Sequence, residues 1–487
     1  MPQSFNSLRD YLTFLEQRGQ IHRVTAEVDW DLEVTQIADV LIKEGNKPAL
    51  LFENIKDSSM PLCINLFGTT DRMAWALGVD DLDELVVRLQ KILNMAQSPP
   101  TGWMEKIRAL GDLAKIASNQ PKVVQNAPCQ EVVLTGEDID LFELPILKCW
   151  PDDAGRFITL PLVVTRDPDT GSRNVGIYRM QVFDKKTTGM HWQTHKVGAQ
   201  HERSGKTKGL RRLEAAVALG SDPATIWAGS VPFPPGIDEF AAAGLIREKS
   251  VELVRCKTVD LEVPAHAEII LEGYVDLDER QLEGPFGDHT GYYSQAEMYS
   301  VFHITAITRR SDSIYPTIVV GRPPSEDYFM GKATERIMLP LLQLVLPEVQ
   351  DINMPAEGVF HNLLIVSIKK EYPGHAQKVM HAIWGLGLLQ LTKLIVVVDE
   401  FVDVQDLSEV AWRVTNNIDA RRDLSFVDGP VDDLDHASSG WRYGSKAGID
   451  ATRKLKGEES SRDWPDDVVM SETIKGMVER RWGEYGL

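Results

Sequence analysis

The sequence predicts a mixed α/β protein of several domains, with α/β units at both ends and a β-rich domain between them. Its 487 residues correspond to about three domains of ordinary size. Helix-like and strand-like hydrophobic patterns alternate over residues 1–118 and again over 326–487. Residues 119–325 instead show many short strand-like runs, separated by Gly, Pro and Asp, which favour a barrel or sandwich.

The N-terminal unit begins with a helix signal. Ser7 is a typical N-cap, Gly19 closes the helix, and one face carries apolar residues at positions 8, 11, 12 and 15. A second helix is predicted from about Asp31, and Gly45-Asn46 ends it. A strand follows over Pro48–Ile55, and helical segments continue to about residue 118.

The middle of the chain predicts strands, with one interrupting helix near Gly209–Leu219. Three prolines and one glycine form a rigid turn: Pro232, Pro234, Pro235 and Gly236. The predicted strands cover Glu131–Leu134, Ile158–Thr165, Asn174–Phe183, Thr225–Ser230, Ala267–Tyr274 and Val301–Arg309.

The last third alternates between helix and strand, which implies a parallel sheet covered by helices. Helices are expected near residues 332–346, 375–389 and 407–417, and strands over 359–368 and 393–398. The polar tail contains Trp464, Trp482 and an amphipathic stretch from Ser471. That stretch is either a surface helix or a subunit contact.

Charge and cysteine usage restrict partners and compartment. The net charge of −20 disfavours nucleic acid and anionic lipid as general partners, and any anionic ligand needs a local cluster of cations. The four cysteines form no CxxC pair, which favours buried thiols in a reducing compartment. We see neither a secretory signal nor a transmembrane run. The protein is therefore expected to be cytoplasmic.

Two acidic residues in a glycine-rich segment, Leu282–Tyr293, are the first catalytic candidates. Three glycines and a proline force this segment to turn, so Glu283 and Asp288 could converge on one pocket. Repulsion between two carboxylates would then raise one pKa toward the range of a general acid. The alternative is a hairpin whose acidic residues cap turns and face water.

Two further segments carry polar groups in unusual places. Asn174 and Arg179 are polar residues on the otherwise apolar strand Asn174–Arg179. Arg179, if buried, needs a carboxylate partner such as Glu283 or a substrate; an exposed edge strand is the alternative. A basic stretch runs from His191 to Arg212. We expect it to end in a helix and to be the place for phosphate recognition, unless it is simply a solvated loop.

The sequence also contains candidate ligands for a metal ion. Asn174, His191 and Glu239 together offer oxygen and nitrogen ligands that suit Mn²⁺ or Mg²⁺. The sequence alone does not show that these residues meet. No Walker A, GxGxxG, GxSxG or HExxH pattern is present.

These segments together resemble the UbiD family of prenylated-flavin decarboxylases, from the first helix to near the C-terminus. The resemblance is carried by Asn174–Arg179, His191-Trp192-Gln193, Pro235–Glu239 and, above all, Glu283–Tyr292. It implies an N-terminal α/β domain, a central split β-barrel that binds the flavin, and a C-terminal α/β domain involved in oligomers. Prenylated FMN, Mn²⁺ (or Mg²⁺) and K⁺ are the implied cofactors.

The resemblance also assigns residues. Arg179, Glu283 and Asp288 correspond to the catalytic trio, and Asn174, His191 and Glu239 to metal ligands. The residues in the cofactor-binding segments are Asn174, Ile177, Tyr178, Arg179, His191, Trp192, Gln193, Lys196 and Glu239. Some members carry Glu where this chain has Asp288, and the segment around His191 varies among members.

The implied reaction is reversible, non-oxidative decarboxylation of an aromatic or unsaturated acid, in which the cofactor is the electron sink. The expected substrate is 4-hydroxy-3-polyprenylbenzoate of quinone biosynthesis. Small phenolic, heteroaromatic or cinnamic-type acids, and a flavin-binding scaffold without catalysis, are the alternatives. A flavin prenyltransferase would supply the cofactor, a prenylated substrate would bring peripheral membrane contact, and a homodimer or homohexamer is expected.

Overall fold

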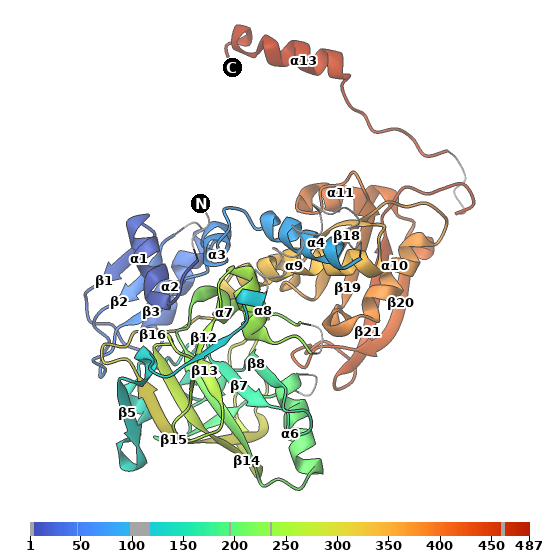
Figure 1. The fold of residues 1–487 in the computed structure, drawn as a ribbon. Helices are drawn as coiled ribbons and strands as arrows, with labels where there is room; N and C mark the ends of the chain where they lie inside the picture. Colours follow the sequence, from blue (N-terminus) through green and yellow to red (C-terminus); the bar gives the residue numbers. More distant parts are fainter. Residues whose placement is uncertain (1–3, 46, 98–116, 194–195, 234–235, 459–462) are drawn as a thin grey trace, which may run out of the picture.

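The computed structural model describes residues 4–45, 47–97, 117–193, 196–233, 236–458 and 463–487. Figure 1 shows an N-terminal unit in blue, a central β-rich unit in green and yellow, and a C-terminal unit in orange. The predicted mixed α/β class with several domains is confirmed. Pro234, Pro235 and residues 98–116 of the helical segments expected to run to about residue 118 lie outside the described residues.

The N-terminal unit is a small sheet packed against helices. Strand order is β1-β2-β3-β16, where β1 pairs with β2 in parallel and the last strand comes from the end of the central region. Ser7 caps α1 as predicted, because its hydroxyl accepts the Asp10 backbone N–H at 3.2 Å. The elements are α1 Leu8–Gln17, β1 Ile21–Val24, α2 Glu33–Lys43, β2 Ala49–Phe52, β3 Leu62–Ile64, α3 Thr70–Ala76, α4 Asp83–Gln97 and β16 Tyr315–Pro316.

The central unit is built on a seven-stranded sheet of order β10-β15-β14-β11-β7-β8, with β5 paired to β15. This path is open, so the described strands form no closed barrel. The strands are β4 Lys122–Val124, β5 Val132–Thr135, β6 Phe157–Ile158, β7 Leu162–Arg166, β8 Arg173–Ile177, β9 Met180–Gln181, β10 Thr187–Met190, β11 Arg212–Leu219, β12 Glu252–Arg255, β13 Glu262–Pro264, β14 Ile269–Glu283 and β15 Glu297–Arg309. The helices are α6 Val197–Thr207, α7 Pro223–Ala228 and α8 Glu239–Ile246.

Two predicted elements of the central unit are wrong. The expected helix over residues 209–219 is strand β11, which pairs with β7 and β14 and is buried over most of its length. The alanines of this segment favour a helix, but hydrogen bonding to a strand on each side outweighs that weak preference. The expected strand over 225–230 is helix α7, with Pro223 in its first turn and Asp222 as N-cap.

The C-terminal unit has the predicted strand and helix alternation. Strands β18, β19 and β21 are parallel, and antiparallel β17 and β20 form the edges of the order β17-β18-β19-β21-β20. The elements are α9 Glu326–Val345, β17 Val349–Asn353, η4 Ala356–Gly358, β18 Leu363–Ile368, α10 His375–Trp384, η5 Gly387–Leu391, β19 Leu394–Asp399, α11 Leu407–Asn417, α12 Ala420–Asp423, β20 Leu424–Pro430 and β21 Tyr443–Asp450.

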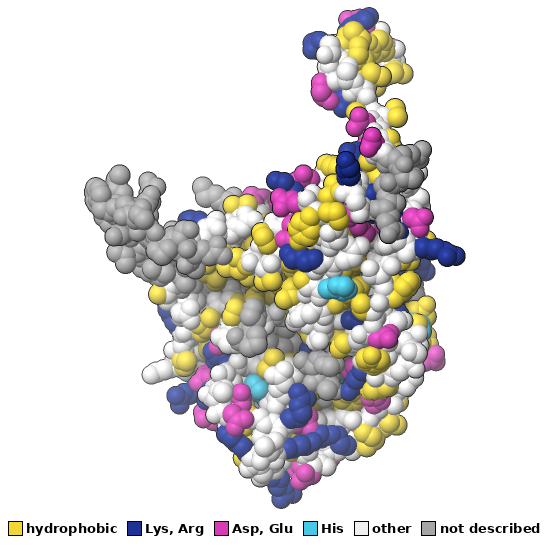
Figure 2. Space-filling view, turned by 90° about the vertical axis from the view of Figure 1, so that its right-hand side faces the viewer, with side chains coloured by type: hydrophobic (Ala, Val, Ile, Leu, Met, Phe, Trp, Pro, Cys, Tyr) yellow, Lys and Arg dark blue, Asp and Glu magenta, His cyan; other side chains and the backbone are white. Residues whose placement is uncertain are grey.

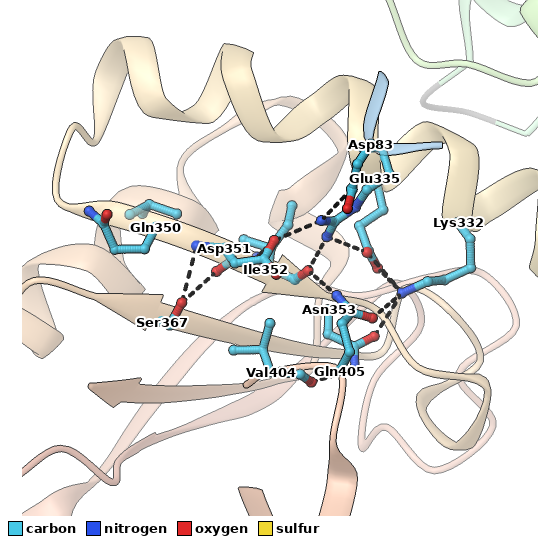
Figure 3. Close-up of polar contacts among 12 residues, drawn as sticks. Asp83, Lys332, Glu335, Gln350, Asp351, Ile352, Asn353, Ser367, Val404 and Gln405 are labelled. Atoms are coloured by element: carbon cyan, nitrogen blue, oxygen red, sulfur yellow. Dashed lines mark hydrogen bonds and ion pairs between the residues drawn. The ribbon is translucent and has the colours of Figure 1, made fainter. Parts of the chain in front are cut away.

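A buried polar network joins helix α9 to this sheet (Figure 3). Lys332 Nζ lies 2.8 Å from both carboxylate oxygens of Glu335 and 2.9 Å from the side-chain oxygens of Asn353 and Gln405. Glu335 also accepts bonds from Arg336 NH2 at 2.6 Å and from the Met354 backbone N–H at 2.5 Å. The fully buried Glu335 carboxylate therefore holds two cations and one strand end together.

The tail ends in helix α13 Glu472–Arg480 and the turn η6 Trp482–Tyr485, which stand away from the body (Figure 1). Every residue of α13 and η6 is at least partly exposed. Figure 2 shows hydrophobic side chains gathered on this protruding part. Across the described ranges, no helix combines the length and the apolar character needed to span a membrane.

Candidate active site

The loop after strand β14 returns the chain toward the sheet and brings two carboxylates together. Gly284 (φ +91°) and Gly291 (φ +80°) adopt the left-handed region that favours glycine. A Cβ at Gly291 would lie 3.0–3.1 Å from Arg322, so the loop also packs closely there. Asp288 and Gly291 close a turn within the loop through a 2.9 Å backbone bond. Asp288 therefore faces the same arginine as Glu283.

Arg179, two residues beyond β8, lies between these two carboxylates. Its Nε donates to Glu283 Oε1 at 2.9 Å, and NH2 lies 3.3 Å from Glu283 Oε2. NH1 forms a short ion pair with Asp288 Oδ2, and NH2 donates to Ser294 Oγ at 3.1 Å. The guanidinium also lies over the Phe286 ring, 4.8 Å from its centroid. The structure thus brings the predicted trio into one contact.

The electrostatics of the trio correct one expectation. Repulsion between carboxylates was expected to raise one pKa, but Arg179 separates them. Burial raises the pKa of Asp288, yet Arg179 and His289 outweigh it and hold that pKa well below its usual range. Burial likewise opposes ionisation of Glu283, while bonds from His191 and Arg179 lower its pKa. Both carboxyl groups are ionised in this geometry, and Asp288 needs a proton before it can act as an acid.

His191, one of the predicted metal ligands, lies against Glu283 of the trio. Its Nδ1 is 2.7 Å from Glu283 Oε2, and its ring packs on Tyr299 at 4.1 Å between centroids. Burial and the nearby Arg179 lower the pKa of the imidazole. A neutral His191 that donates from Nδ1 to Glu283 would leave Nε2 as a lone-pair donor, which is the form that binds metal. Its role as a ligand stays a prediction.

Glu239 lies against strand β8 beside Asn174. Glu239 Oε2 accepts the backbone N–H of Val175 at 3.0 Å, next to Asn174, whose amide lies 3.4 Å from the Tyr178 hydroxyl. Burial raises the pKa of Glu239 to about 7. Among the described residues no Lys, Arg or His forms an ion pair with this carboxyl group. A half-buried carboxyl group beside an amide fits a divalent cation, which would stabilise the ionised form.

The remaining predicted cofactor residues lie at the end of β8 or just before helix α6. Ile177 pairs through its backbone with Gly229 at 3.0 Å, and the Tyr178 hydroxyl accepts the Gly198 N–H at 3.3 Å. The buried Trp192 Nε1 has no hydrogen-bond partner among the described residues. Gln193 and Lys196 are partly buried. Burial lowers the pKa of Lys196, so an anion beside this cation would be well placed.

Two lysines of the basic stretch pair with local acidic residues. Lys206 pairs with Glu202 at 2.9 Å and Lys208 with Asp169 at 2.8 Å. His201 is buried and lies 2.9 Å from Thr165. The stretch forms helix α6 and then strand β11, so the helix expected at its end is wrong. Lys196, just before α6, is the cation of this stretch that best fits an anionic cofactor.

Two histidines near Asp288 were not predicted from the sequence: His289 contacts Asp288, and His361 contacts His289. His289 Nδ1 lies 2.7 Å from Asp288 Oδ1, and His289 Nε2 lies 2.9 Å from His361 Nε2. His289 directly follows the acid in the predicted loop, so its type and place were a usable signal. His361 lies 72 residues further along the chain, and no local pattern marks it.

A buried arginine held by two carboxylates, next to a carboxyl and amide that fit a cation, defines a site for chemistry on an anionic substrate. Models of one family match nearly all of the chain: the N-terminal domain over residues 12–89, the Rift-related domain over 122–323 and the C-terminal domain over 328–451 of 3-octaprenyl-4-hydroxybenzoate carboxy-lyase. The chain belongs to this family, the UbiD carboxy-lyases, and is a UbiD-type decarboxylase.

Relatives and solved structures agree with the family match. An uncharacterized protein of Archaeoglobus fulgidus is 52% identical over 99% of this chain and 98% of its own length. Vanillic acid decarboxylase of Sedimentibacter hydroxybenzoicus in closed form superposes with a TM-score of 0.87, is 28% identical, and each chain is 99% covered. The UbiD-class enzyme HmfF of Pelotomaculum thermopropionicum, in complex with FMN, gives a TM-score of 0.78 at 31% identity over 94% of this chain and 97% of that chain.

Proposed function

We propose that the protein uses prenylated FMN to decarboxylate an aromatic or α,β-unsaturated carboxylic acid, reversibly and without net oxidation. One observation carries the proposal: Arg179 lies between Glu283 and Asp288 in a buried site. A carrier protein needs no proton donor, so this arrangement argues against a flavin-binding scaffold without catalysis. When bound, prenylated FMN would supply the electron sink that loss of CO₂ from an sp² carbon requires.

The side chains of the trio divide the remaining tasks. Arg179 would bind the substrate carboxylate through its NH1 atom, which now contacts Asp288, while Glu283 keeps the guanidinium oriented through Nε. Displacement of Asp288 from the arginine would remove the charge that lowers its pKa most strongly. Asp288 would then hold a proton at Oδ and deliver it to the carbon that loses CO₂.

We propose that Asn174, His191 and Glu239 hold Mn²⁺ (or Mg²⁺), with K⁺ nearby, beside the cofactor phosphate. Support comes from the half-buried Glu239 carboxyl group, whose raised pKa shows that its ionised form lacks a paired cation among the described residues. Lys196 would neutralise part of the phosphate charge, and Trp192 would offer its free indole N–H to the cofactor. Ile177, Tyr178 and Gln193 would line the same place.

The first substrate we propose is 4-hydroxy-3-polyprenylbenzoate, as an intermediate of quinone biosynthesis. The family description, a 3-octaprenyl-4-hydroxybenzoate carboxy-lyase, supports it. A small phenolic, heteroaromatic or cinnamic-type acid is the second candidate, favoured by the 0.87 TM-score to a vanillic acid decarboxylase. Peripheral membrane contact belongs to the first candidate only, since a polyprenyl chain partitions into lipid.

The deciding experiment is co-expression with a flavin prenyltransferase and purification without oxygen. We expect a bound flavin whose mass includes an added isoprenoid unit, and CO₂ release from at least one acid of a panel with and without a prenyl chain. Incorporation of labelled bicarbonate into the product would establish reversibility. A folded, metal-loaded protein that holds no flavin would refute the proposal, and turnover of small acids alone would select the second candidate.

Glu239→Gln tests the metal set. We expect Mn²⁺ affinity to fall more than about 100-fold, because an amide cannot supply the charged oxygen ligand. The measurement is metal content and Mn²⁺ titration of the purified variant. Asp238→Asn is the matched control: Asp238 caps helix α8 and pairs with Arg173 at 2.7 Å, and asparagine caps helices equally well. Equal metal affinity in both variants would remove Glu239 from the site.

We propose a cytoplasmic homo-oligomer, with the C-terminal helix α13 as a contact between copies. All four cysteines are free thiols, consistent with a reducing compartment. Met470, Ile474, Val478 and Trp482 repeat every four positions and line a recess of about 500 Å³ on α13. A short isolated helix is marginal in water, so an apolar face of this kind is stable when another surface covers it. A second copy is the occupant we propose.

Substitution of Val478 with aspartate tests this contact. We expect the assembly to dissociate, since a charge would replace an apolar contact at the centre of the stripe. Light scattering coupled to size-exclusion chromatography measures the mass. Thr473→Asp lies on another face of the same helix and should leave the mass unchanged. An unchanged oligomer in Val478→Asp would show that α13 is a free surface helix.

A further inference from the structure

Asp288 begins a line of three side chains that crosses from the central unit to the C-terminal unit. Its Oδ1 accepts the His289 backbone N–H at 2.7 Å and contacts His289 Nδ1 at 2.7 Å. The other ring nitrogen of His289 lies 2.9 Å from His361 Nε2, and the ring centroids are 5.1 Å apart. His361 lies between η4 and strand β18. The line therefore exists only where the two units touch.

The backbone before His361 is held in an unfavourable conformation that aims the ring at His289. Val359 (φ +53°) and Phe360 (φ +44°) are both left-handed, although neither is glycine. For a β-branched valine this conformation is rare and costs of order 1–3 kcal/mol. Phe360 packs against α9, where a Cβ at Gly331 would approach its ring to 3.1 Å, and its ring lies 5.5 Å from that of His289. Such strain persists where the surrounding packing enforces it.

The contacts fix where the protons lie. An ionised Asp288 only accepts, so His289 Nδ1 carries a proton. One proton lies between the two facing Nε2 atoms, because two lone pairs or two N–H groups would repel. Burial opposes a charge on His289, but Asp288 outweighs it and raises the pKa of His289. Burial and the facing His289 lower the pKa of His361 to about 4. When the pair carries a positive charge, the charge is therefore on His289, and neutral His361 accepts from it.

Charged groups from every neighbouring element set this balance. Asp288 lies in the same loop, Asp327 in the first turn of α9 and Asp432 just after β20, and all three favour the cationic form of His289. Lys196, before α6, disfavours a charge on His361. Burial raises the pKa of Asp327 to about 7, and its buried Oδ2 has no hydrogen-bond partner among the described residues.

Decarboxylation consumes a proton at each turnover, because R–COO⁻ and H⁺ give R–H and CO₂. Asp288 is ionised here, so the acid of the reaction must be protonated before it can protonate carbon. His289 in its protonated form is the acid in contact with Asp288 Oδ1. Transfer of the Nδ1 proton leaves Asp288 as a carboxylic acid and His289 as a neutral imidazole that still donates from Nε2 to His361. A proton from solvent then restores the imidazolium.

We propose that His289 supplies the proton that Asp288 delivers, and that His361 of the C-terminal unit is the positioning residue that keeps His289 turned toward Asp288. This inference rests on the proposed decarboxylation, in which Asp288 is the acid. It makes proton supply depend on contact between the central and C-terminal units. Two histidines 72 residues apart would then act on one reaction without touching the substrate.

The first test needs neither cofactor nor substrate. Hydrogen–deuterium exchange at histidine C2, followed by mass spectrometry across a pH series, gives the pKa of individual imidazoles in the intact protein. We expect His289 to titrate above the ordinary value of about 6.5 and His361 below it. His361→Leu should lower the pKa of His289, because the imidazolium loses its acceptor, whereas His361→Gln should preserve it through the amide oxygen.

The second test uses the loaded enzyme. His289→Gln should lower kcat about 10- to 100-fold, with KM little changed, and the alkaline limb of the kcat profile should move to lower pH. Small imidazole buffers should restore part of the rate. His361→Leu should show a smaller loss in the same direction, and His361→Gln should recover it. His266→Gln is the matched control, since His266 pairs with Glu252 at 2.8 Å on the surface elsewhere.

The outcomes separate the inference from the proposed function. A His289 pKa at or below its ordinary value, or a His289→Gln profile that overlays the wild type, would overturn the inference. So would equal losses in His361→Leu and His361→Gln with an unshifted profile, because that pattern marks a purely structural residue. Absence of decarboxylation by the wild type would refute the proposed function, while the histidine pKa values would still decide whether the proton is stored at His289.

Discussion

Asp288→Asn is expected to lower kcat by about 1000-fold, within the range that a positioned general acid contributes. Asparagine keeps the size of the side chain and can still contact Arg179, but it holds no acidic proton. Cofactor and metal binding should be unchanged, since Asn174, His191 and Glu239 lie elsewhere in the site. CO₂ release at saturating substrate, normalised to bound flavin, measures the effect.

Two further variants make this result specific. Asp288→Glu should recover much of the activity, because it restores an acidic proton and resembles the residue that some members of the family carry. Glu297→Gln removes a neighbouring carboxyl that pairs in register with Glu283 across β14 and β15, and should leave kcat close to wild type. If Asp288→Asn retained more than about a tenth of the wild-type rate, another group would be the proton donor.

Glu335→Gln is expected to produce the largest loss of stability. The Glu335 carboxylate is fully buried and holds Lys332 and Arg336 (Figure 3). Its neutralisation removes the charge that the half-buried Lys332 and the buried Arg336 share, which costs about 3–5 kcal/mol. The unfolding midpoint of the C-terminal unit should fall by roughly 10 °C. Differential scanning calorimetry measures the midpoint.

The control for Glu335→Gln is an ion pair of the same chemistry at the surface. Asp39 and Lys43 pair at 2.5 Å on helix α2, and Asp39→Asn should change stability by at most about 1 kcal/mol. Equal effects of the two substitutions would mean that water reaches the α9 network. A selective loss with Glu335→Gln would show that the network is what fixes α9 to the C-terminal sheet.

Local signals were sufficient for much of the secondary structure and for part of the site. The cap at Ser7 and the apolar face of α1 are readable in the sequence, because a helix end and a helix face depend on residues a few positions apart. The glycines around Asp288 predicted a turn for the same reason. The resemblance carried by Glu283–Tyr292 identified the family, which the family models confirm.

The tertiary structure decided everything that depends on contacts between distant segments. The sequence of strand β11 predicts a helix, but pairing with β7 and β14 makes it a strand. Arg179 and Asp288, 109 residues apart, meet only in the folded protein, and their pairing reverses the pKa shift expected from carboxylates alone. His361 contacts His289 because packing forces Val359 and Phe360 into a strained backbone. The pattern of residues within a segment indicates which local structure that segment prefers. Strand pairing, pKa shifts and backbone strain depend instead on which distant segments pack together and exclude water.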